Sequence, residues 1–248
     1  MASTTTPCEK SASAVGYDPT GIHQSEAVYN SPLSSLLGLA ETNKVIHSIP
    51  SIPHYVEIVV FLFGYAFNPV SIPFWIVAVS LTGVVVPGGN GMTSGRIYYP
   101  PTFYLATVLV TVLGTELCKA SFRATRPETV LSPEFRSSKM RRYGAWVASL
   151  KSKHSFPSGD SAQAANAVLF WYFFVSPLWK EEQPKLTTLL HMVAFLIFFP
   201  GVAFARIFYH CHWIEDCLGG AVLAGLLHRT IMPIVADWIW RALQKFSS

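Results

Sequence analysis

Residues 186–205 read LTTLLHMVAFLIFFPGVAFA, a run of 20 residues without Asp, Glu, Lys or Arg. Such a run matches the roughly 20 apolar residues that an α-helix needs to cross the hydrocarbon core of a membrane. Three further stretches lack these charged residues in the same way: 58–95, 97–115 and 161–179. The sequence therefore predicts an all-α, polytopic bundle of membrane-spanning helices.

We expect about six transmembrane helices in this bundle. Their predicted ranges are Ile52–Phe67, Val70–Val86, Thr102–Lys119, Ser161–Trp179, Leu186–Phe204 and Trp213–Val235. The first two are separate because a helix should end at Asn68-Pro69. The sixth contains Glu215, Asp216 and Arg229. Ionisable side chains inside a membrane are costly, so this helix is expected to carry a functional site.

The N-terminal part differs from the rest of the chain. Residues 1–50 are predicted to form a tail, and residues 51–248 a membrane-embedded domain. Within the tail, Pro32–Ser48 shows roughly helical spacing of apolar residues. This segment is read either as an interfacial helix or as a helix packed on the bundle.

Composition excludes several classes of protein. Charged residues make up 13% of the chain and hydrophobic residues 51%, whereas soluble domains carry about 25% charge. This excludes a water-soluble globule, and so much apolar surface excludes a disordered chain. The net charge of +4 forms no basic stripe for nucleic acid. The four cysteines have no disulfide-like spacing, which excludes a stapled secreted scaffold.

Three short patterns occur in order at the ends of predicted spans. They are Lys119-x6-Arg126-Pro127, Phe156-Pro157-Ser158-Gly159-Asp160 and Ala205-Arg206-x5-His212-x3-Asp216. The third span ends on one membrane face and the fourth begins there. The fourth span crosses away and the fifth returns, so the sixth starts on that same face. We therefore expect all three patterns to meet at one membrane surface.

The residue types in these patterns suit phosphoryl transfer. Its transition state spreads negative charge over three oxygens, so catalysis depends mainly on positioning and electrostatics. Lys119, Arg126 and Arg206 supply three cations, and arginine can bind phosphate oxygens in a bidentate manner. Backbone N–H groups at the helix start after Pro157 can bind an anion. We expect no metal and no cofactor at this site.

The third pattern also offers a nucleophile. His212 and Asp216 lie four residues apart and share one helix face. The carboxylate can hold the proton of one ring nitrogen, which leaves the other nitrogen free to attack phosphorus.

The three patterns resemble Lys-x6-Arg-Pro, Pro-Ser-Gly-His and Ser-Arg-x5-His-x3-Asp, the signatures of the type-2 phosphatidic-acid phosphatase superfamily. That superfamily is shared with vanadium haloperoxidases and bacterial acid phosphatases. The resemblance covers roughly residues 55–240 and implies a six-helix membrane core. It implies a phosphate clamp of Lys119, Arg126, Ser158, Gly159 and Arg206. It also implies that His212 is the nucleophile and Asp216 its orienting carboxylate.

Two positions depart from the family pattern. Ala205 replaces the serine before the third motif's arginine, which is a minor change. Asp160 replaces the histidine of the second motif, and the resemblance implies that this histidine protonates the leaving oxygen. A carboxyl group is mostly ionised at neutral pH and is then a poor acid. This favours a diphosphate substrate, whose leaving group needs no proton, or an acidic compartment.

Other residues beside the motifs have two interpretations each. His154 and His210 are candidates to replace the missing acid, although histidines in flanking loops are usually structural. Glu116 lies one helical turn before Lys119 and either pairs with it or faces outward. Gly220, within a run of small residues, indicates close helix packing.

The sequence thus favours an integral-membrane, metal-independent phosphatase that hydrolyses a lipid phosphate or diphosphate through a phosphohistidine. An isoprenoid diphosphate is the favoured substrate, and membrane lipids are the expected partners. Three alternatives stay open: an inactive membrane scaffold or regulator, a vanadate-binding haloperoxidase, and a lipid phosphotransferase. In a eukaryotic cell we expect the endoplasmic reticulum or another endomembrane. Lys and Arg are nearly balanced between the two faces, so the positive-inside rule does not orient the site.

Overall fold

The computed structural model describes residues 32–49, 52–67, 71–84, 94–127, 143, 147, 154–177 and 183–247. Within these ranges the chain is helical and contains no strand. The helices, in chain order, are α2 (Pro32–Leu36), α3 (Ala40–Ser48), α4 (His54–Tyr65), α5 (Ile72–Val84), α6 (Ser94–Phe122), α10 (Gly159–Phe170), η3 (Trp171–Val175), α12 (Pro184–Val193), η4 (Ala194–Phe198), α13 (Phe199–Phe208), α14 (Ile214–Thr230) and α15 (Met232–Ser247). The π-helical turns η3 and η4 continue α10 and join α12 to α13. The predicted all-α class is confirmed.

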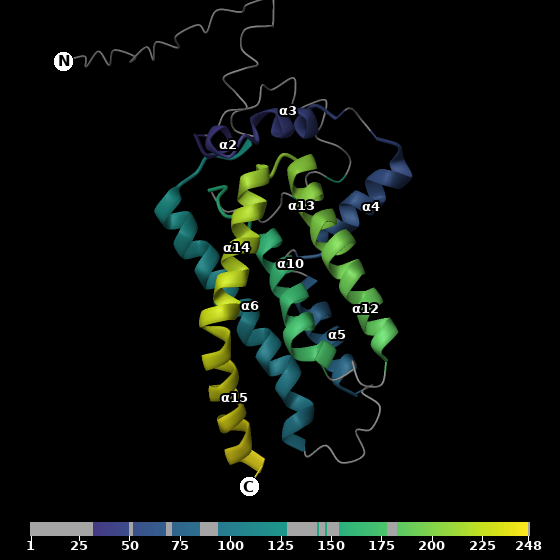
Figure 1. The fold of residues 1–248 in the computed structure, drawn as a ribbon, viewed down its shortest axis with the longest axis vertical. Helices are drawn as coiled ribbons and strands as arrows, with labels where there is room; N and C mark the ends of the chain where they lie inside the picture. The colour runs from purple at the N-terminus through teal and green to yellow at the C-terminus, as the bar shows by residue number, and fades with distance from the viewer. Residues whose placement is uncertain are drawn as a thin grey trace, which may run out of the picture.

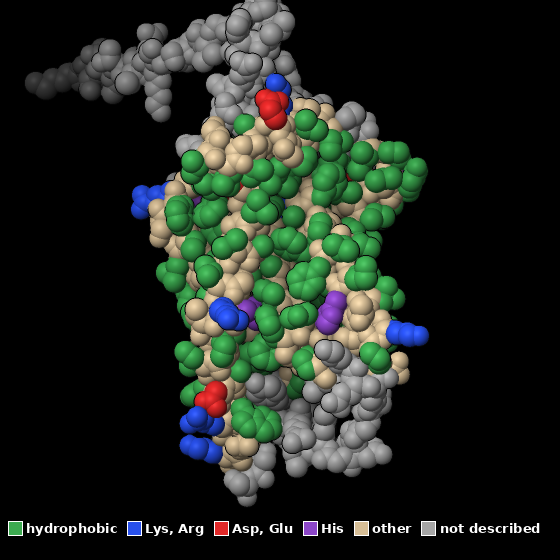
Figure 2. Space-filling view, viewed as in Figure 1, with side chains coloured by type: hydrophobic (Ala, Val, Ile, Leu, Met, Phe, Trp, Pro, Cys, Tyr) green, Lys and Arg blue, Asp and Glu red, His purple; other side chains and the backbone are tan. Residues whose placement is uncertain are grey.

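The long helices run side by side and α2 and α3 lie across one end of the bundle (Figure 1). The C-terminus lies at the opposite end. Hydrophobic side chains cover most of the visible face, and charged side chains are sparse on it and lie mostly toward the two ends (Figure 2). This distribution is typical of a surface that faces lipid.

Two helices of the described residues are long and apolar enough to cross a membrane: Pro100–Phe122 with 23 residues and Pro184–Phe208 with 25 residues. The pair Ile214–Thr230 and Met232–Lys245, bent by 50°, is a third candidate if it forms one span. The predicted count of six is therefore not confirmed.

The first two predicted spans correspond to α4 and α5, which have 12 and 13 residues. At a rise of 1.5 Å per residue each is about 18–20 Å long, which is shorter than a hydrocarbon core of about 30 Å. In Figure 1, α4 lies near the end that carries α3, and α5 lies toward the other end. The two helices therefore follow one another along the bundle.

The predicted N-terminal helix forms as two helices. Gly38, at a φ of +66°, turns the chain between α2 and α3, and glycine adopts this left-handed conformation without steric cost. Both helices pack on the bundle, α2 against α14 and α3 against α13. The segment therefore contacts the end of the bundle through both helices.

Helix α10 lies at the centre of the bundle, packed against α14, α6 and α13. Small residues allow this close packing. A Cβ atom on Gly220 of α14 would lie only 2.6 Å from the carbonyl oxygen of Ser158. Glycine is therefore required where α14 meets the start of α10.

A polar seam fixes the register of α6, α10 and α14 deeper in the bundle. The Asn166 side-chain amide donates to Thr107 Oγ1 at 3.2 Å, and its oxygen lies 2.8 Å from His228 Nε2. Gln163 Nε2 donates to the Val108 carbonyl at 3.0 Å. Hydrogen bonds between membrane helices satisfy polar groups that lipid cannot.

Two predicted features lie outside the described residues: the tail over residues 1–30 and the Asn68-Pro69 break.

Candidate active site

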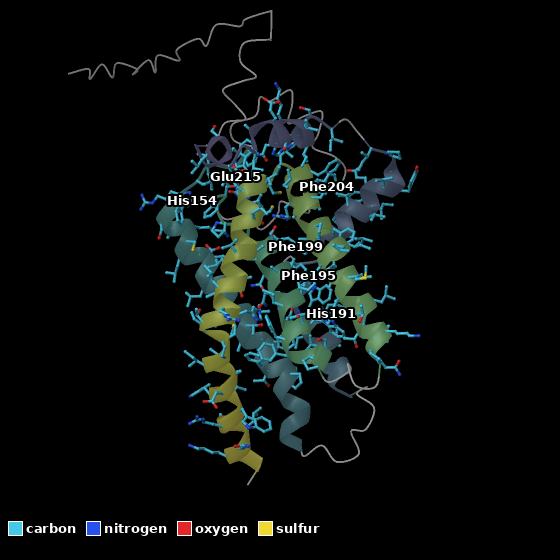
Figure 3. The ribbon with its side chains drawn as sticks, viewed as in Figure 1. His154, His191, Phe195, Phe199, Phe204 and Glu215 are labelled. Carbon is cyan, nitrogen blue, oxygen red and sulfur yellow. The ribbon has the colours of Figure 1, made fainter. Side chains whose placement is uncertain are left out.

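The three sequence patterns come together at the end of the bundle that carries α3. The Ser158 N–H donates to the Asp216 carbonyl at 2.9 Å. Arg126 Nη1 donates to the Cys211 carbonyl at 2.8 Å. Figure 3 shows Glu215, which neighbours Asp216 in the sequence, at this end of the bundle and His191 well below it. The third pattern therefore contacts both of the other patterns.

Lys119 lies near the end of α6 with its side chain buried. A Cβ atom built on Gly159 would lie 3.6 Å from Lys119 Nζ. The ammonium group therefore faces the first residue of α10, where the backbone N–H groups are free of intrahelical partners. Lys119 also forms the expected pair with Glu116, at 2.7 Å. Because the Glu116 side chain is 54% exposed, this pair contributes little.

Ser158 is the N-cap residue of α10. Its Oγ accepts a hydrogen bond from the Ser161 N–H at 3.3 Å, the interaction that favours serine at this position. Its own N–H donates to the backbone carbonyl of Asp216. The start of α10 is thus fixed by contacts within α10 and by contacts with α14.

Arg206, near the end of α13, is held by contacts on two sides. Its Nη1 donates to the Val147 carbonyl at 2.9 Å and to the Gly64 carbonyl at 3.3 Å. Its Nη2 lies 3.0 Å from Asp160 Oδ2, and the Arg206 and Asp160 side chains are 5% and 18% exposed. The Asp160 carboxylate therefore binds one of the cations expected to bind phosphate.

His212 and Asp216 are both almost fully buried. The distance from His212 Nδ1 to Asp216 Oδ2 is 3.5 Å, longer than a typical hydrogen bond. The same Oδ2 accepts from the Trp213 N–H at 2.8 Å and from Ser155 Oγ. Asp216 thus caps α14 and faces His212 with one oxygen atom. This arrangement favours the proton on Nδ1 and leaves the Nε2 lone pair available.

The surroundings of His212 keep its ring neutral. Burial lowers the pKa of His212 well below its ordinary value of 6.5, and nearby Arg206 and Arg126 lower it further. Asp160 acts in the opposite direction. Neutral imidazole is the form that can attack an electrophile.

Sequence reasoning missed several groups that support these residues. Ser155 donates to Asp216, and the Gly64 and Val147 carbonyls hold Arg206. Two of these three partners act through backbone atoms, so no side-chain pattern could reveal them. His210, a candidate acid, instead has its Nδ1 2.7 Å from Nδ1 of His47.

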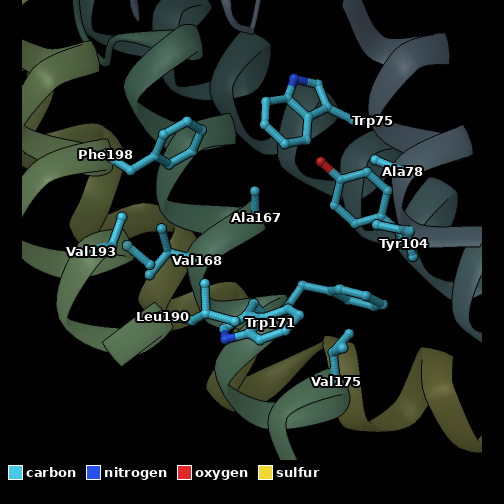
Figure 4. A pocket seen from close by; sticks show the side chains of 13 residues that line it. Trp75, Ala78, Tyr104, Ala167, Val168, Trp171, Val175, Leu190, Val193 and Phe198 are labelled. Atoms are coloured by element: carbon cyan, nitrogen blue, oxygen red, sulfur yellow. The ribbon is translucent and has the colours of Figure 1, made fainter. Parts of the chain in front are cut away.

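An apolar cavity of about 420 Å³ lies deeper in the bundle. Trp75, Tyr104, Ala167, Trp171 and Phe198 are among the side chains that surround it (Figure 4). Nearly all of its lining surface is apolar. Such a cavity suits a hydrocarbon chain.

Apolar packing connects this cavity to the site. Trp75, Ala167 and Phe198 also pack against a cluster that contains Ala164 and Val202. Ala164 lies one helical turn after Asp160, and Val202 one turn before Arg206. The apolar cluster beside the cavity therefore reaches to within one helical turn of the Asp160–Arg206 pair.

No three His, Cys, Asp or Glu side chains converge as metal ligands in the part of the chain that the structure describes. The polar groups that do converge are three cations, a histidine–carboxylate pair and a helix N-terminus.

This fold and site define a helical membrane protein with a buried histidine that is surrounded by cationic side chains. A family model described as the PAP2 superfamily matches residues 100–240, more than half of the chain, and the chain belongs to this superfamily. The resemblance drawn from the motifs is thereby confirmed. No curated protein matches the sequence.

A solved structure is also similar. It is described as the first transmembrane PAP2 type phosphatidylglycerolphosphate phosphatase from Bacillus subtilis. The TM-score is 0.54 and the identity 16%, and the match covers 90% of each chain. At this identity the match supports a shared fold.

Proposed function

We propose that this protein is an integral-membrane phosphatase that hydrolyses a lipid phosphate or diphosphate through a phosphohistidine. The observation that carries this proposal is the buried His212, whose Nδ1 lies 3.5 Å from Asp216 Oδ2, together with the buried Arg126 and Arg206 near its ring. Neutral imidazole supplies the nucleophile, and the cations stabilise the charge that develops on the phosphoryl oxygens.

The reaction then has two steps. In the first, His212 Nε2 forms a bond to phosphorus while the bond from phosphorus to the leaving oxygen breaks, and that oxygen keeps the electron pair. Asp216 stabilises the positive charge that develops on the ring. In the second step, water attacks phosphorus, the N–P bond breaks with its electron pair returning to Nε2, and both protons of the water leave with the phosphate. Inorganic phosphate is released and His212 returns to its neutral form.

The apolar cavity supports a lipid substrate. We place the phosphate near the start of α10, beside Asp160. Ala167, which lines the cavity, lies seven residues after Asp160 on this helix. At 1.5 Å per residue the phosphate and the cavity are therefore about 10 Å apart. A hydrocarbon tail of ten or so carbons spans this distance. Aromatic and small apolar side chains around the cavity suit an isoprenoid tail as well as an acyl chain.

The Asp160–Arg206 ion pair favours a diphosphate. A monophosphate ester must expel an alkoxide, whose conjugate acid has a pKa of about 15.7, as water does. A diphosphate expels a phosphate monoester whose pKa is about 6, and this group leaves without a proton. A site whose expected acid is tied to an arginine therefore suits a lipid diphosphate best.

The same ion pair favours a second candidate, an inactive membrane scaffold or regulator. In that case Asp160 neutralises Arg206 permanently, and the fold is retained without the chemistry.

Phosphate release from the purified protein in detergent distinguishes these functions. The panel consists of lipid monophosphates and diphosphates with matched tails, and His212→Ala is the control. We expect wild-type turnover on diphosphates and none in the variant. If the wild type and His212→Ala both release no phosphate, the scaffold is correct and the phosphatase proposal is wrong.

A further inference from the structure

The buried face of α2 and α3 is polar. Ser34, Asn43 and His47 are fully buried, while Leu36 and Val45 of the same segment are 80% and 63% exposed. This is the reverse of an ordinary surface helix, which buries its apolar residues. The buried polar side chains must therefore have specific partners.

Asn43 uses its whole amide group at the start of α14. Its oxygen accepts from the Ile214 N–H at 3.0 Å. Its Nδ2 lies 2.9 Å from Glu215 Oε2 and 2.8 Å from Ser34 Oγ. Ser34 Oγ in turn donates to Glu215 Oε1. The four groups form a closed network between α2–α3 and the first turn of α14.

His47 contacts the other part of the same segment. Its Nδ1 lies 2.7 Å from Nδ1 of His210. Its ring also packs edge-on against Trp213, with centroids 5.1 Å apart. His210 adopts a φ of +55°, a conformation that is uncommon for a residue with a side chain. A hydrogen bond to His47 helps to hold it there.

These contacts fall on both sides of the nucleophile. The residues contacted are 210, 213, 214 and 215, and His212 lies between them. The family match begins at residue 100, so the three inward-facing side chains lie outside it. The 3.5 Å separation of His212 and Asp216 must shorten for a strong hydrogen bond, and a misplacement of about 1 Å can reduce turnover about 10²-fold.

We propose that Asn43, with Ser34 and Glu215, positions residues 210–216 so that His212 is held in line for attack. Asn43 is a positioning residue, since its contacts are with the Ile214 N–H, Glu215 and Ser34. The catalytic part of this inference rests on the proposed phosphatase function, whereas the positioning of residues 210–216 can be measured without turnover.

A pair of substitutions tests the network by exchanging its charge. Asn43→Asp places a carboxylate against Glu215, and the repulsion should release the start of α14. Glu215→Gln alone should have a small effect, because the new amide can turn its oxygen to Asn43 and its NH2 to Ser34. The double variant restores complementary partners. The carboxylate at position 43 accepts from the Ile214 N–H, and the amide at position 215 donates to this carboxylate.

We expect Asn43→Asp to lower kcat about 10²-fold while KM changes little, because misplacement of the nucleophile affects the reacting atoms. The double variant should recover to within about threefold of wild type, as expected for directly coupled residues. Hydrogen–deuterium exchange of residues 210–216 should rise in Asn43→Asp and return to the wild-type level in the double variant. Thr42→Ala, an exposed neighbour on α3, is the matched control and should change neither measurement.

Unchanged exchange in Asn43→Asp would overturn the inference, as would a double variant that recovers neither exchange nor kcat. A loss confined to KM would overturn it too, because positioning of the nucleophile acts on kcat. Absence of turnover in the wild type would contradict the proposed function instead, and the exchange measurements would still decide whether Asn43 positions this segment.

Discussion

Replacing Asp160 by histidine changes two properties of the site, its charge and its ability to donate a proton. In the structure Asp160 Oδ2 lies 3.0 Å from Arg206 Nη2, so a phosphate bound to Arg206 would lie close to this carboxylate. Two unit charges about 5 Å apart repel by roughly 3 kcal/mol at an effective dielectric constant of about 20. Removing the carboxylate charge should therefore strengthen phosphate binding up to about 10²-fold. A working general acid contributes a further 10²–10⁴-fold, roughly, to turnover.

Asp160→Asn and Asp160→His separate the two effects. Asp160→Asn should lower KM for both substrate types and leave monophosphate turnover slow. Asp160→His should raise kcat on a lipid monophosphate about 10²-fold or more, and on the matching diphosphate by less than about threefold, since that leaving group needs no proton.

The assay is phosphate release between pH 5 and 8 from a monophosphate and a diphosphate that carry the same isoprenoid tail. Rapid monophosphate hydrolysis by wild type at pH 7, together with its abolition in Asp160→Asn, would refute this reasoning. Asp160 would then be the acid.

Four further outcomes follow from the site. His212→Ala should lower phosphate release by roughly 10²-fold or more, and Asp216→Asn should lower it less. A phosphorylated protein trapped from His212→Ala would contradict the assignment of His212 as the nucleophile. Orthovanadate should inhibit as a transition-state mimic and EDTA should not, which dose–response curves measure; strict metal dependence would mean that the chemistry is different. The folded chain resists protonation of His212, whereas the unfolded chain binds that proton near its ordinary pKa of 6.5. Stability should therefore fall as the pH drops below 6.5, and thermal unfolding at a series of pH values measures this. The fall should be smaller in His212→Ala. Gly220→Ala should destabilise by about 1–3 kcal/mol through its clash with the Ser158 carbonyl, whereas Gly225→Ala, where a Cβ meets open space, should not, and equal melting temperatures would refute this packing argument.

The motifs could be predicted because their chemistry lies in side chains at fixed spacing. His212 and Asp216 do lie close together, but they do not share a helix face as predicted, because α14 begins at Ile214 and His212 precedes it. The charge-free runs give the order of the membrane crossings. That order predicts that Lys119, Ser158 and Arg206 lie at the same end of the bundle.

The rest depends on tertiary packing. A charge-free run gives the length of chain available to the membrane, and it does not reveal that α4 and α5 extend over only 12 and 13 of the described residues. The buried role of Asn43 had no local signal either, because its partners Ile214 and Glu215 are about 170 residues away along the chain. The Asp160–Arg206 pair has no local signal either, since the two residues belong to different patterns and meet only in the folded chain.

One oxygen atom, Oδ2 of Asp216, both caps α14 and faces the nucleophile. The start of α14 and the alignment of His212 are consequently coupled through one atom. A chain whose α14 starts at the wrong residue has no oriented imidazole, so misfolded molecules are also inactive ones. For the same reason, screens for stability and screens for activity should select the same residue at position 216.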